Sequence, residues 1–583
     1  MKRIKYLIII CLLSIIPINS VKAQNTNTMY FMNEIAERNN LNPAFTPSCN
    51  FYLDFIFLPN IYFSFGNDNF IIRDFIYNQN GKTQTFLNSK ESLELFFKNM
   101  QPTTTMNFNY NLNILSFGFQ VKKSYFTFDL GLNMDVATYL PSDLFKFALY
   151  GTPDPNGINT FNLSQLGVDA SLYSSAAIGY MYKINKQLTV GAKAKFLMGY
   201  ANINTSINKL YLNASRQEWS LETDGTINAS LPIRFNTLEN GNIDFGSIQM
   251  NSANELLELL YKPAGIGAAI DLGIKYEPIK NFVISASVTD LGMIYWNRNS
   301  FSANMQGSHS IDELIDYTIG DTLSTDAIVD KFTGLGNEIL NSMHTDGENR
   351  PYKSVLRGNF FFGAEYGVLK NRISLGVVNH LKFKNTHLQD EVTVALNLRP
   401  IHCFNASVSH SFINGRLGTL GLGLNFKMGI MNIYIIADYI PTSYAKVSLG
   451  DNALSIEDKT ILSSVLVPNR SQMYNVQMGW TWNIGQHARD LDQDGVKNRK
   501  DKCSETDMDF LRKQCPGLKK KQYIDKQGCY LDDDKDGVHN CIDQCPDTPE
   551  NTPVNQDGCP LDSIDEETSN DSNESAEAND QNL

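Results

Sequence analysis

Apolar and polar residues alternate along much of this chain with a period of two. In residues 105–114, methionine, aromatic and aliphatic side chains alternate with asparagine, and residues 125–136 repeat the pattern with other small polar residues. This period places the two kinds of side chain on opposite faces of a β-strand. The runs exceed the roughly five or six residues of an average strand and match the roughly 9–11 residues that cross a bilayer at a tilt.

The same alternation returns many times before residue 487. Further strands are predicted at 51–58, 171–182, 187–199, 356–367, 371–381, 390–399, 403–411, 417–426, 430–440 and 472–484, and in a hairpin at 265–290. The chain therefore carries about 12–14 spanning strands, and outer-membrane barrels generally have an even number.

Residues 200–262 and 300–350 interrupt the alternation with more polar sequence. They contain short strand-like pieces and three predicted helical pieces, at 253–261, 311–317 and 325–343. Because these segments are too polar to face lipid, we expect both regions to form long extracellular loops or to plug the lumen.

A transmembrane β-barrel and a soluble β-sandwich both produce alternating strands. The number and length of the strands favour the barrel, as do the aromatic residues Tyr474, Trp480 and Trp482 near strand ends. Polar faces rich in asparagine, threonine, serine and glycine suit a wet lumen, and closure pairs every strand edge, as lipid requires. We predict an all-β chain whose residues 24–487 form an antiparallel transmembrane barrel.

The first 23 residues have the features of a secretory signal peptide. A basic start is followed by an apolar run at 6–16 and by a small-residue cleavage site after Ala23. No later apolar run is long enough for a transmembrane helix. The formal net charge of −13 argues against binding to nucleic acid. The chain is therefore expected in the cell outer membrane, with its lipid as a partner.

Two aspartate-rich loops, 490–501 and 532–543, share one ligand pattern. Each has carboxylates at positions one, three, five and twelve, glycine at six and asparagine at nine, which is how oxygen ligands of calcium are spaced. An EF-hand would carry glutamate at twelve and flanking helices; the other alternative is a solvated acidic linker. The predicted Ca²⁺ ligands, including the main-chain carbonyls of the two valines, are Asp490, Asp492, Asp494, Val496, Asn498, Asp501, Asp532, Asp534, Asp536, Val538, Asn540 and Asp543.

The flanks of these loops resemble thrombospondin type 3 repeats over residues 488–560. The resemblance rests on three motifs, Asp501-Lys-Cys503, Asp543-Gln-Cys545-Pro-Asp-Thr-Pro549 and Asn555-Gln-Asp-Gly-Cys559-Pro560. It implies calcium held in a rod that is nearly free of helix and tied by disulfides. Residues 561–583 are acidic, without bases or aromatics, and are predicted to be a disordered tail.

Six cysteines in the repeat segment predict a disulfide framework in an exported chain. The resemblance implies a pair between Cys545 and Cys559. Serine follows Cys503 where the repeat usually has proline, and an insertion carries Cys515. The connectivity of the remaining four therefore stays open, namely Cys503, Cys515, Cys529 and Cys541. Cys49 and Cys403, each alone in a strand-like stretch, are expected to be free thiols.

The barrel sequence resembles an uncharacterised family, the DUF5723 type. The resemblance rests on the hairpin segments 265–278 and 285–296, and an Asn-Pro-Ala stretch at 42–44 resembles the start of PorP/SprF-like barrels. The resemblance to the DUF5723 type covers residues 24–486 and implies a fold related to PorP/SprF and FadL-like barrels, with no known activity. We interpret the hairpin glycines as packing positions that let strands bend and approach closely.

No residue pattern indicates an enzyme. The eight histidines are dispersed, and none lies in a metalloprotease, nucleophile-elbow or zinc-finger pattern. Satisfied or solvated histidines are expected instead of catalytic ones.

Three functions are compatible with this organisation. The first is an envelope scaffold, in secretion or surface attachment, that docks a protein partner through a periplasmic calcium-binding segment. The second is a FadL-like transporter of hydrophobic or small solutes. The third is calcium-dependent cell adhesion through the outer loops. The C-terminal segment is expected in the periplasm because a barrel with an even strand number has both ends there.

Overall fold

The structure, a computed structural model, divides into two compact units, residues 1–486 and 487–583. The described residues are 27–561 except for 68, 71, 80–81, 87–88, 151–159, 215–218, 238–242, 251–260, 312–338, 340–343, 349, 370, 385–386, 402, 414–415, 442–443, 449–454, 457–458, 461–463, 469–472, 487–493, 495, 497–499, 504–505, 507, 518–521 and 551. The signal peptide, the acidic tail and almost all of the three predicted helical pieces lie outside the described residues.

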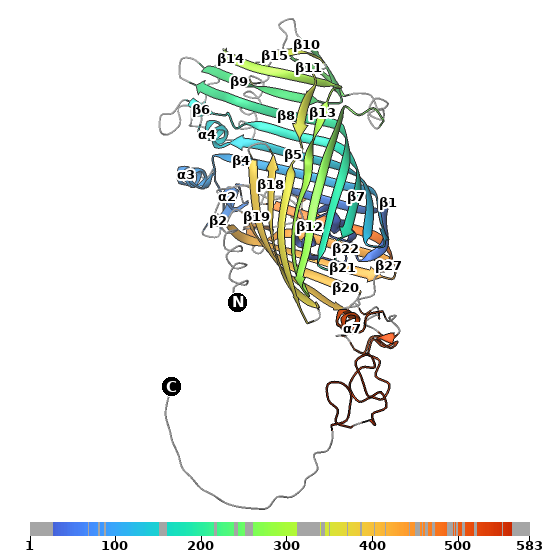
Figure 1. The fold of residues 1–583 in the computed structure, drawn as a ribbon. Helices are drawn as coiled ribbons and strands as arrows, with labels where there is room; N and C mark the ends of the chain where they lie inside the picture. Colours follow the sequence, from blue (N-terminus) through green and yellow to red (C-terminus); the bar gives the residue numbers. More distant parts are fainter. Residues whose placement is uncertain are drawn as a thin grey trace, which may run out of the picture. The chain divides into compact units, whose positions relative to one another are not determined.

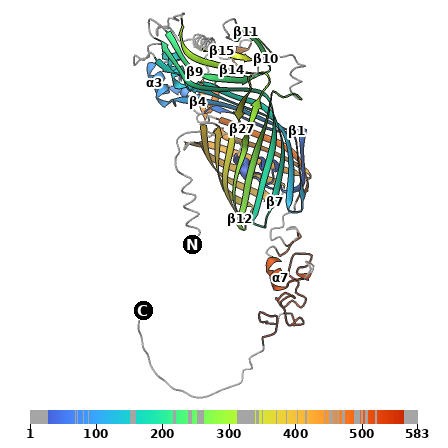
Figure 2. The same cartoon turned by 45° about the horizontal axis from the view of Figure 1, so that its top comes forward.

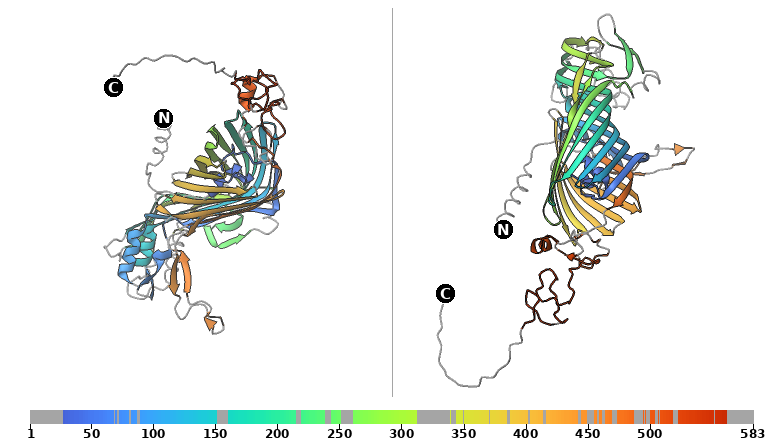
Figure 3. Two further views of the ribbon diagram at one scale, coloured as in Figure 1. Left: turned by 90° about the horizontal axis from the view of Figure 1, so that it is seen from below. Right: turned by 45° about the vertical axis from the view of Figure 1, so that its right-hand side comes forward.

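Fourteen strands of the described chain form one closed antiparallel barrel (Figures 1 and 3). Each strand pairs with the next one along the wall, and the last pairs with the first, with Phe51 opposite Ile484. The count confirms the predicted 12–14 strands. The barrel strands are β1 (Cys49–Asn67), β4 (Thr103–Val121), β5 (Ser124–Pro141), β7 (Gly167–Lys183), β8 (Leu188–Ala214), β12 (Gly265–Ile279), β13 (Phe282–Trp296), β17 (Gly358–Val368), β18 (Ile373–Lys384), β19 (His387–Ile401), β20 (Phe404–Ile413), β21 (Arg416–Met428), β22 (Met431–Pro441) and β27 (Met473–Gln486).

The barrel buries polar side chains and exposes apolar ones. On β19, Leu396 and Leu398 are exposed whereas Asn397 and Arg399 are buried, and on β12 Asp271 is fully buried between exposed aliphatic neighbours. A soluble sandwich would show the opposite distribution, with its polar face toward water. The alternation therefore separates a lumen-facing polar set from an outward apolar set that suits lipid.

The two ends of the barrel differ in the lengths of their connections. Short turns such as 122–123 and 280–281 join strands at one end, and Cys49 lies opposite Gln486 there, so the wall begins and ends at that end. The connections at the other end are mostly long. They carry α2 (Ile72–Phe75), β2 (Ile76–Gln79), β3 (Lys82–Thr85), α3 (Lys90–Asn99), α4 (Ser142–Tyr150), β6 (Thr160–Asn162), β10 (Ile233–Thr237), β11 (Ile243–Met250), β16 (Tyr352–Val355), β23 (Tyr444–Ser448), β24 (Ser455–Ile456), β25 (Lys459–Thr460) and β26 (Ser464–Pro468).

Strand β8 continues beyond the barrel wall into a separate sheet extension. Its second half pairs with β9 (Trp219–Ser230), which pairs with β14 (Ser300–Ile311), which in turn pairs with β15 (His344–Glu348) (Figure 2). Buried apolar residues of α4, β6, β8, β9 and β14 form a core of their own there. For these regions the sequence predicted long loops or lumen plugs with short strand-like pieces. The described strands lie in the long connections between β8 and β12 and between β13 and β17, where a continuous β-ladder satisfies their backbone groups.

The lumen is filled in part by residues 27–48, which we call the plug. It contains two short 3-10 helices, η1 (Asn27–Phe31) and η2 (Ala36–Asn40), and most of its residues are buried. Glycines on the lumenal face make room for it: a Cβ atom at Gly363 would overlap the Tyr30 ring, and one at Gly376 would overlap the Phe31 ring. Of the hairpin glycines, Gly273 likewise faces the plug, whereas the others lie against neighbouring strands, as predicted.

The C-terminal unit contains little regular structure. Its described residues include one short helix, α7 (Met508–Gln514), and a small apolar cluster around Leu511 and Tyr523. Among the described residues of the whole chain, no helix is long and apolar enough to cross a membrane.

Candidate functional site

A cavity of 240 Å³ lies in the barrel unit between the plug and the wall. Plug residues such as Glu37 and Asn40 line one side, and strands from β1 to β27 supply the other. Amide, hydroxyl and charged groups dominate this lining. Its charged residues are Glu37, Asp129, Asp135, Lys193, Lys195, Asp290, Arg357 and Lys382.

Most of these charges are held in buried ion pairs. Lys195 Nζ lies 2.8 Å from an Asp271 oxygen and 2.6 Å from an Asp290 oxygen, and an Arg357 nitrogen lies 3.1 Å from Asp135. A buried pair neutralises both charges when its geometry is good. The ion pairs therefore leave a polar surface with few free charges in the cavity.

Lys193 joins the wall to the plug. Its ammonium lies 2.8 Å from Asp129 on β5 and donates hydrogen bonds to the side-chain oxygens of Asn39 (2.8 Å) and Asn40 (2.5 Å). One buried cation thus contacts both the barrel wall and the plug. Removing it would leave Asp129 and two plug amides without this donor.

The N-terminal end of the plug is anchored to the opposite wall by hydrogen bonds. The Thr28 hydroxyl donates to Asp438 and shares a hydrogen bond of 2.6 Å with Ser409. Asn27 donates to Thr393 at 3.1 Å. Because all these side chains are buried, each bond satisfies groups that water would otherwise have to reach.

His380 is a satisfied core histidine, as expected for most of the dispersed histidines. Its two ring nitrogens lie 3.0 Å from the Asn27 side-chain oxygen and 3.1 Å from that of Asn359. Its ring also stacks on Phe361. This residue therefore connects the plug to β17 and β18.

Glu37 on the plug is the least compensated acid facing the cavity. It is 3% exposed, and neither carboxylate oxygen has a hydrogen-bond partner. Burial and, next in size, the neighbouring carboxylate of Asp54 raise the pKa of the Glu37 carboxyl to about 8. Near neutral pH this side chain is therefore largely protonated in the docked plug.

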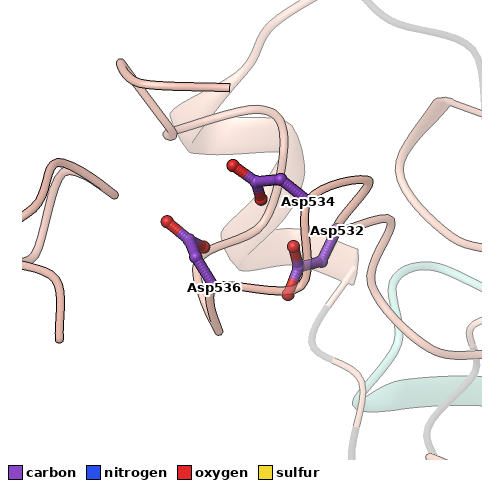
Figure 4. A group of neighbouring side chains, drawn as sticks. All are labelled: Asp532, Asp534 and Asp536. Carbon is purple, nitrogen blue, oxygen red and sulfur yellow. The ribbon is translucent and has the colours of Figure 1, made fainter. Parts of the chain in front are cut away.

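A candidate metal centre lies in the second aspartate loop of the C-terminal unit. One carboxylate oxygen each of Asp532, Asp534 and Asp536 fall within 4.8 Å of one another, and Figure 4 shows the three side chains gathered on one loop. Asp534 Oδ1 and Asp536 Oδ2 are buried without hydrogen-bond partners. Partnerless carboxylate oxygens are the donors that a hard cation such as Ca²⁺ requires, so the residues present fit this ion.

The other predicted ligands of this loop are engaged locally. Asn540 accepts from the Asp533 main-chain N–H at 2.8 Å, and Asp543 Oδ1 accepts from the Cys545 N–H at 2.7 Å. The structure brings the first three carboxylates together but does not bring Asn540 or Asp543 into that group. The Val538 carbonyl, the remaining predicted ligand, lies on the same loop.

In the first loop the structure describes Asp494, Val496 and Asp501, whereas Asp490, Asp492 and Asn498 lie outside the described residues. The described parts of the two loops are built alike. Asp494 and Asp501 lie against Gly528, just as the corresponding Asp536 and Asp543 lie against Gly558. Both glycines have positive φ, of 81° and 78°, which favours glycine at the point of contact.

Three disulfides tie the C-terminal unit. Cys545 pairs with Cys559, which is the pair that the repeat resemblance implies. The structure also assigns the pairs that the sequence left open, Cys503–Cys529 and Cys515–Cys541, each across 26 residues. Cross-links of this kind stabilise a segment with little apolar core. Cys49 and Cys403 are free, buried and exposed respectively.

Sequence reasoning missed the plug and therefore the cavity beside it. The available signal was the set of lumen-facing glycines, including Gly421 and Gly423, whose Cβ atoms would overlap Thr28 and Met32. In the sequence alone such glycines are equally compatible with bends in the strand.

A family model described as "Family of unknown function (DUF5723)" matches residues 43–438. No curated protein matches the chain. Among solved structures, the P. putida toluene transporter TodX is similar with a TM-score of 0.34 and 10% identity, over 80% of this chain and 97% of TodX. A Pseudomonas aeruginosa FadL homologue gives 0.36 at 9% identity over 80% and 99%, and the CymD monoaromatic hydrocarbon channel gives 0.33 at 9% over 78% and 94%. With TM-scores below 0.5, these likenesses add nothing to the barrel that the strand pairings establish.

Proposed function

This chain belongs to the DUF5723 family of unknown function, as its hairpin sequence indicated, and we propose that it is an outer-membrane channel for a small polar solute, closed by its own plug. The observation that carries the proposal is the polar cavity of 240 Å³ between the plug and a closed wall. An exterior of exposed apolar side chains supports the membrane location.

The polar lining selects between the two kinds of solute that the sequence left open. A hydrophobic solute would gain little from a surface of asparagine, aspartate, lysine and tyrosine, because these groups would lose water without replacement partners. A small solute with hydrogen-bonding groups would replace that water. TodX and CymD are named for aromatic hydrocarbons, and this cavity has a different chemistry.

The plug must move for solute to pass, and its contacts suit reversible docking. Many are hydrogen bonds and ion pairs to the wall, such as the pair between Glu34 and Lys427, and water is able to replace them. Plug movement would therefore exchange partners without opening a large apolar core, although Tyr30 and Phe31 would leave an aromatic contact.

Conductance in planar bilayers tests the proposal. We expect full-length protein to conduct rarely and a variant lacking residues 27–45 to conduct steadily and to admit small sugars or amino acids in vesicle-swelling assays. Retention of the heat-modifiable barrel on gels shows that the variant has folded. A folded variant that stays closed would contradict the channel function.

The plug also suits the envelope-scaffold hypothesis, because a barrel closed by its own chain has no need to conduct. Gln486 lies at the end with short turns, which supports a periplasmic location for the segment that follows. Affinity purification from mildly solubilised envelopes, with calcium or with a chelator, separates the two functions. A stoichiometric protein partner that leaves on chelation would favour the scaffold, and binding of whole cells to a surface, lost on deletion of the long connections, would favour adhesion.

For the C-terminal segment we propose that Ca²⁺ is held by the aspartate loops and orders a segment that has few apolar residues. The partnerless oxygens of Asp534 and Asp536 support this role. Metal binding of this kind supplies folding free energy directly. The likeness to thrombospondin type 3 repeats stays a prediction from the sequence.

A further inference from the structure

Lys382 on β18 is a buried lysine that has no partner among the described residues. It is 4% exposed and lines the lumenal cavity, yet no described residue forms a hydrogen bond or ion pair with it. The other three cations of the lining, Lys193, Lys195 and Arg357, are all ion-paired. Holding an ammonium away from bulk water without a counter-charge is costly. A bound anion would supply the counter-charge that the described residues do not supply.

The carboxylates around Lys382 are already engaged by other donors. Asp135 faces the guanidinium of Arg357 at 3.1 Å, and Asp290 faces Lys195 at 2.6 Å. Glu391 accepts a hydrogen bond of 2.6 Å from the Tyr439 hydroxyl. Together with Arg357, these three acids are the charged groups that act on Lys382. Within the described part of the chain, none of these three carboxylates forms an ion pair with the Lys382 ammonium.

A tyrosine of the same cavity shares the surroundings of Lys382. Tyr62 on β1 lines the cavity, its buried hydroxyl lies beside Ser64, and Asp135 and Glu391 are among the charged groups around it too. The two side chains thus share neighbours, although they come from strands far apart in the sequence.

We propose that Lys382, with the neighbouring Arg357, forms an anion subsite that takes the carboxylate of a small solute. A carboxylate brings a single negative charge to the single ammonium of Lys382, so a monoanion matches this position better than a phosphate dianion does. A charge-assisted hydrogen bond to a carboxylate would supply the missing partner. The inference rests on the proposed channel function, since it names the class of solute that enters the cavity.

Ligand-observed NMR on the detergent-solubilised full-length chain tests the subsite without requiring conduction. The probes are propionate, the neutral isostere propionamide and the cation propylammonium. We expect propionate to bind and the other two to bind at least tenfold more weakly. Equal binding of propionate and propionamide, or no binding of propionate, would overturn the subsite.

Substitutions then assign the binding to the ammonium. Lys382→Gln should weaken propionate at least tenfold, and Lys382→Arg should retain it within about threefold because the positive charge remains. Lys275→Gln is a matched control, since Lys275 is a barrel lysine that does not line the cavity. Unchanged binding by Lys382→Gln would refute the assignment. The glutamine variant should fold normally because it loses no partner.

The two proposals fail separately. Propionate binding that depends on Lys382 in a chain whose plug deletion does not conduct would remove the channel function and keep the subsite. Conduction without any preference for propionate over propionamide would keep the channel and remove the subsite.

Discussion

The Arg399 guanidinium on β19 donates a 3.0 Å hydrogen bond to the main-chain carbonyl of Phe31 in the plug. The same nitrogen lies 2.7 Å from Glu365, and the other terminal nitrogen donates to Ser374 and Asn371. The wall therefore holds the plug through a backbone atom, using an arginine that three wall residues keep in place. Contacts to a carbonyl do not depend on the plug side chain, so sequence changes at position 31 alone would not remove this bond.

Loss of this arginine should release the plug. Arg399→Met leaves Glu365 buried without its cation and removes the donor to Phe31, and breaking a buried pair of this kind typically costs about 3–5 kcal/mol. We expect faster hydrogen exchange across residues 27–35 and more frequent channel opening. The double variant with Glu365→Met should recover barrel stability but not plug docking. If the exchange of the plug stayed at the wild-type rate, the anchoring role of Arg399 would be wrong.

A methyl group at Gly363 should displace the plug. The new Cβ would overlap the Tyr30 ring, and overpacking in a tight site costs about 1–3 kcal/mol. Gly363→Ala is therefore expected to raise conductance in planar bilayers. Adding Tyr30→Ala removes the overlapping ring and should restore part of the docking. The same conductance in the single and double variants would argue against this contact.

Docking of the plug should weaken as pH rises. The folded-state pKa of Glu37 is raised to about 8 from an ordinary 4.5. Its stabilising contribution is therefore fully present below about pH 4.5 and is lost as pH rises through about 8, where a further buried negative charge appears near Asp54 and Asp129. Protease cleavage within the plug is expected to accelerate between about pH 5 and 8, by up to about tenfold per pH unit, and to level off above that range.

Glu37→Gln serves as the control for this pH dependence. A neutral amide imitates the protonated carboxyl, so the plug of this variant should stay docked at pH 9. A variant that loosens with pH just as the wild type does would assign the effect to another group.

Chelation should loosen the C-terminal unit. Removal of calcium, or the double substitution Asp534→Asn with Asp536→Asn, takes away the cation or two partnerless carboxylates and should speed proteolysis of residues 500–561 severalfold. Terbium luminescence and limited proteolysis measure the two effects. As a control, Asp533→Asn removes one negative charge from the same loop outside the group of three, and this variant should bind terbium as the wild type does. Chelator-insensitive proteolysis of the wild type would contradict a structural calcium site.

Much of the barrel was predictable because strand alternation is a local property. Each residue of a run such as 125–136 shows its face without reference to any other strand, and β5 indeed spans that run. The ligand spacing of loop 532–543 is equally local, which is why three of its carboxylates lie together as the pattern indicates. The pieces that extend β8 into a sheet with β9 and β14 were predicted only as short strand-like segments of long loops, because pairing between segments as distant as β9 and β14 is not a local property.

The sequence by itself determined the strand period, the family and the spacing of the aspartate loops, and it predicts an export signal, since each of these patterns can be recognised from residues close together in the chain. Tertiary structure alone decided what fills the lumen. Gly363 and Gly376 make room for the rings of Tyr30 and Phe31, which are over 300 residues away in the chain, and this role is visible only in the folded barrel. Lys382 likewise lacks a partner among the described residues only because barrel closure places it among carboxylates that Arg357, Lys195 and Tyr439 already hold. Such pairings are set by how distant strands meet, and no local pattern encodes them.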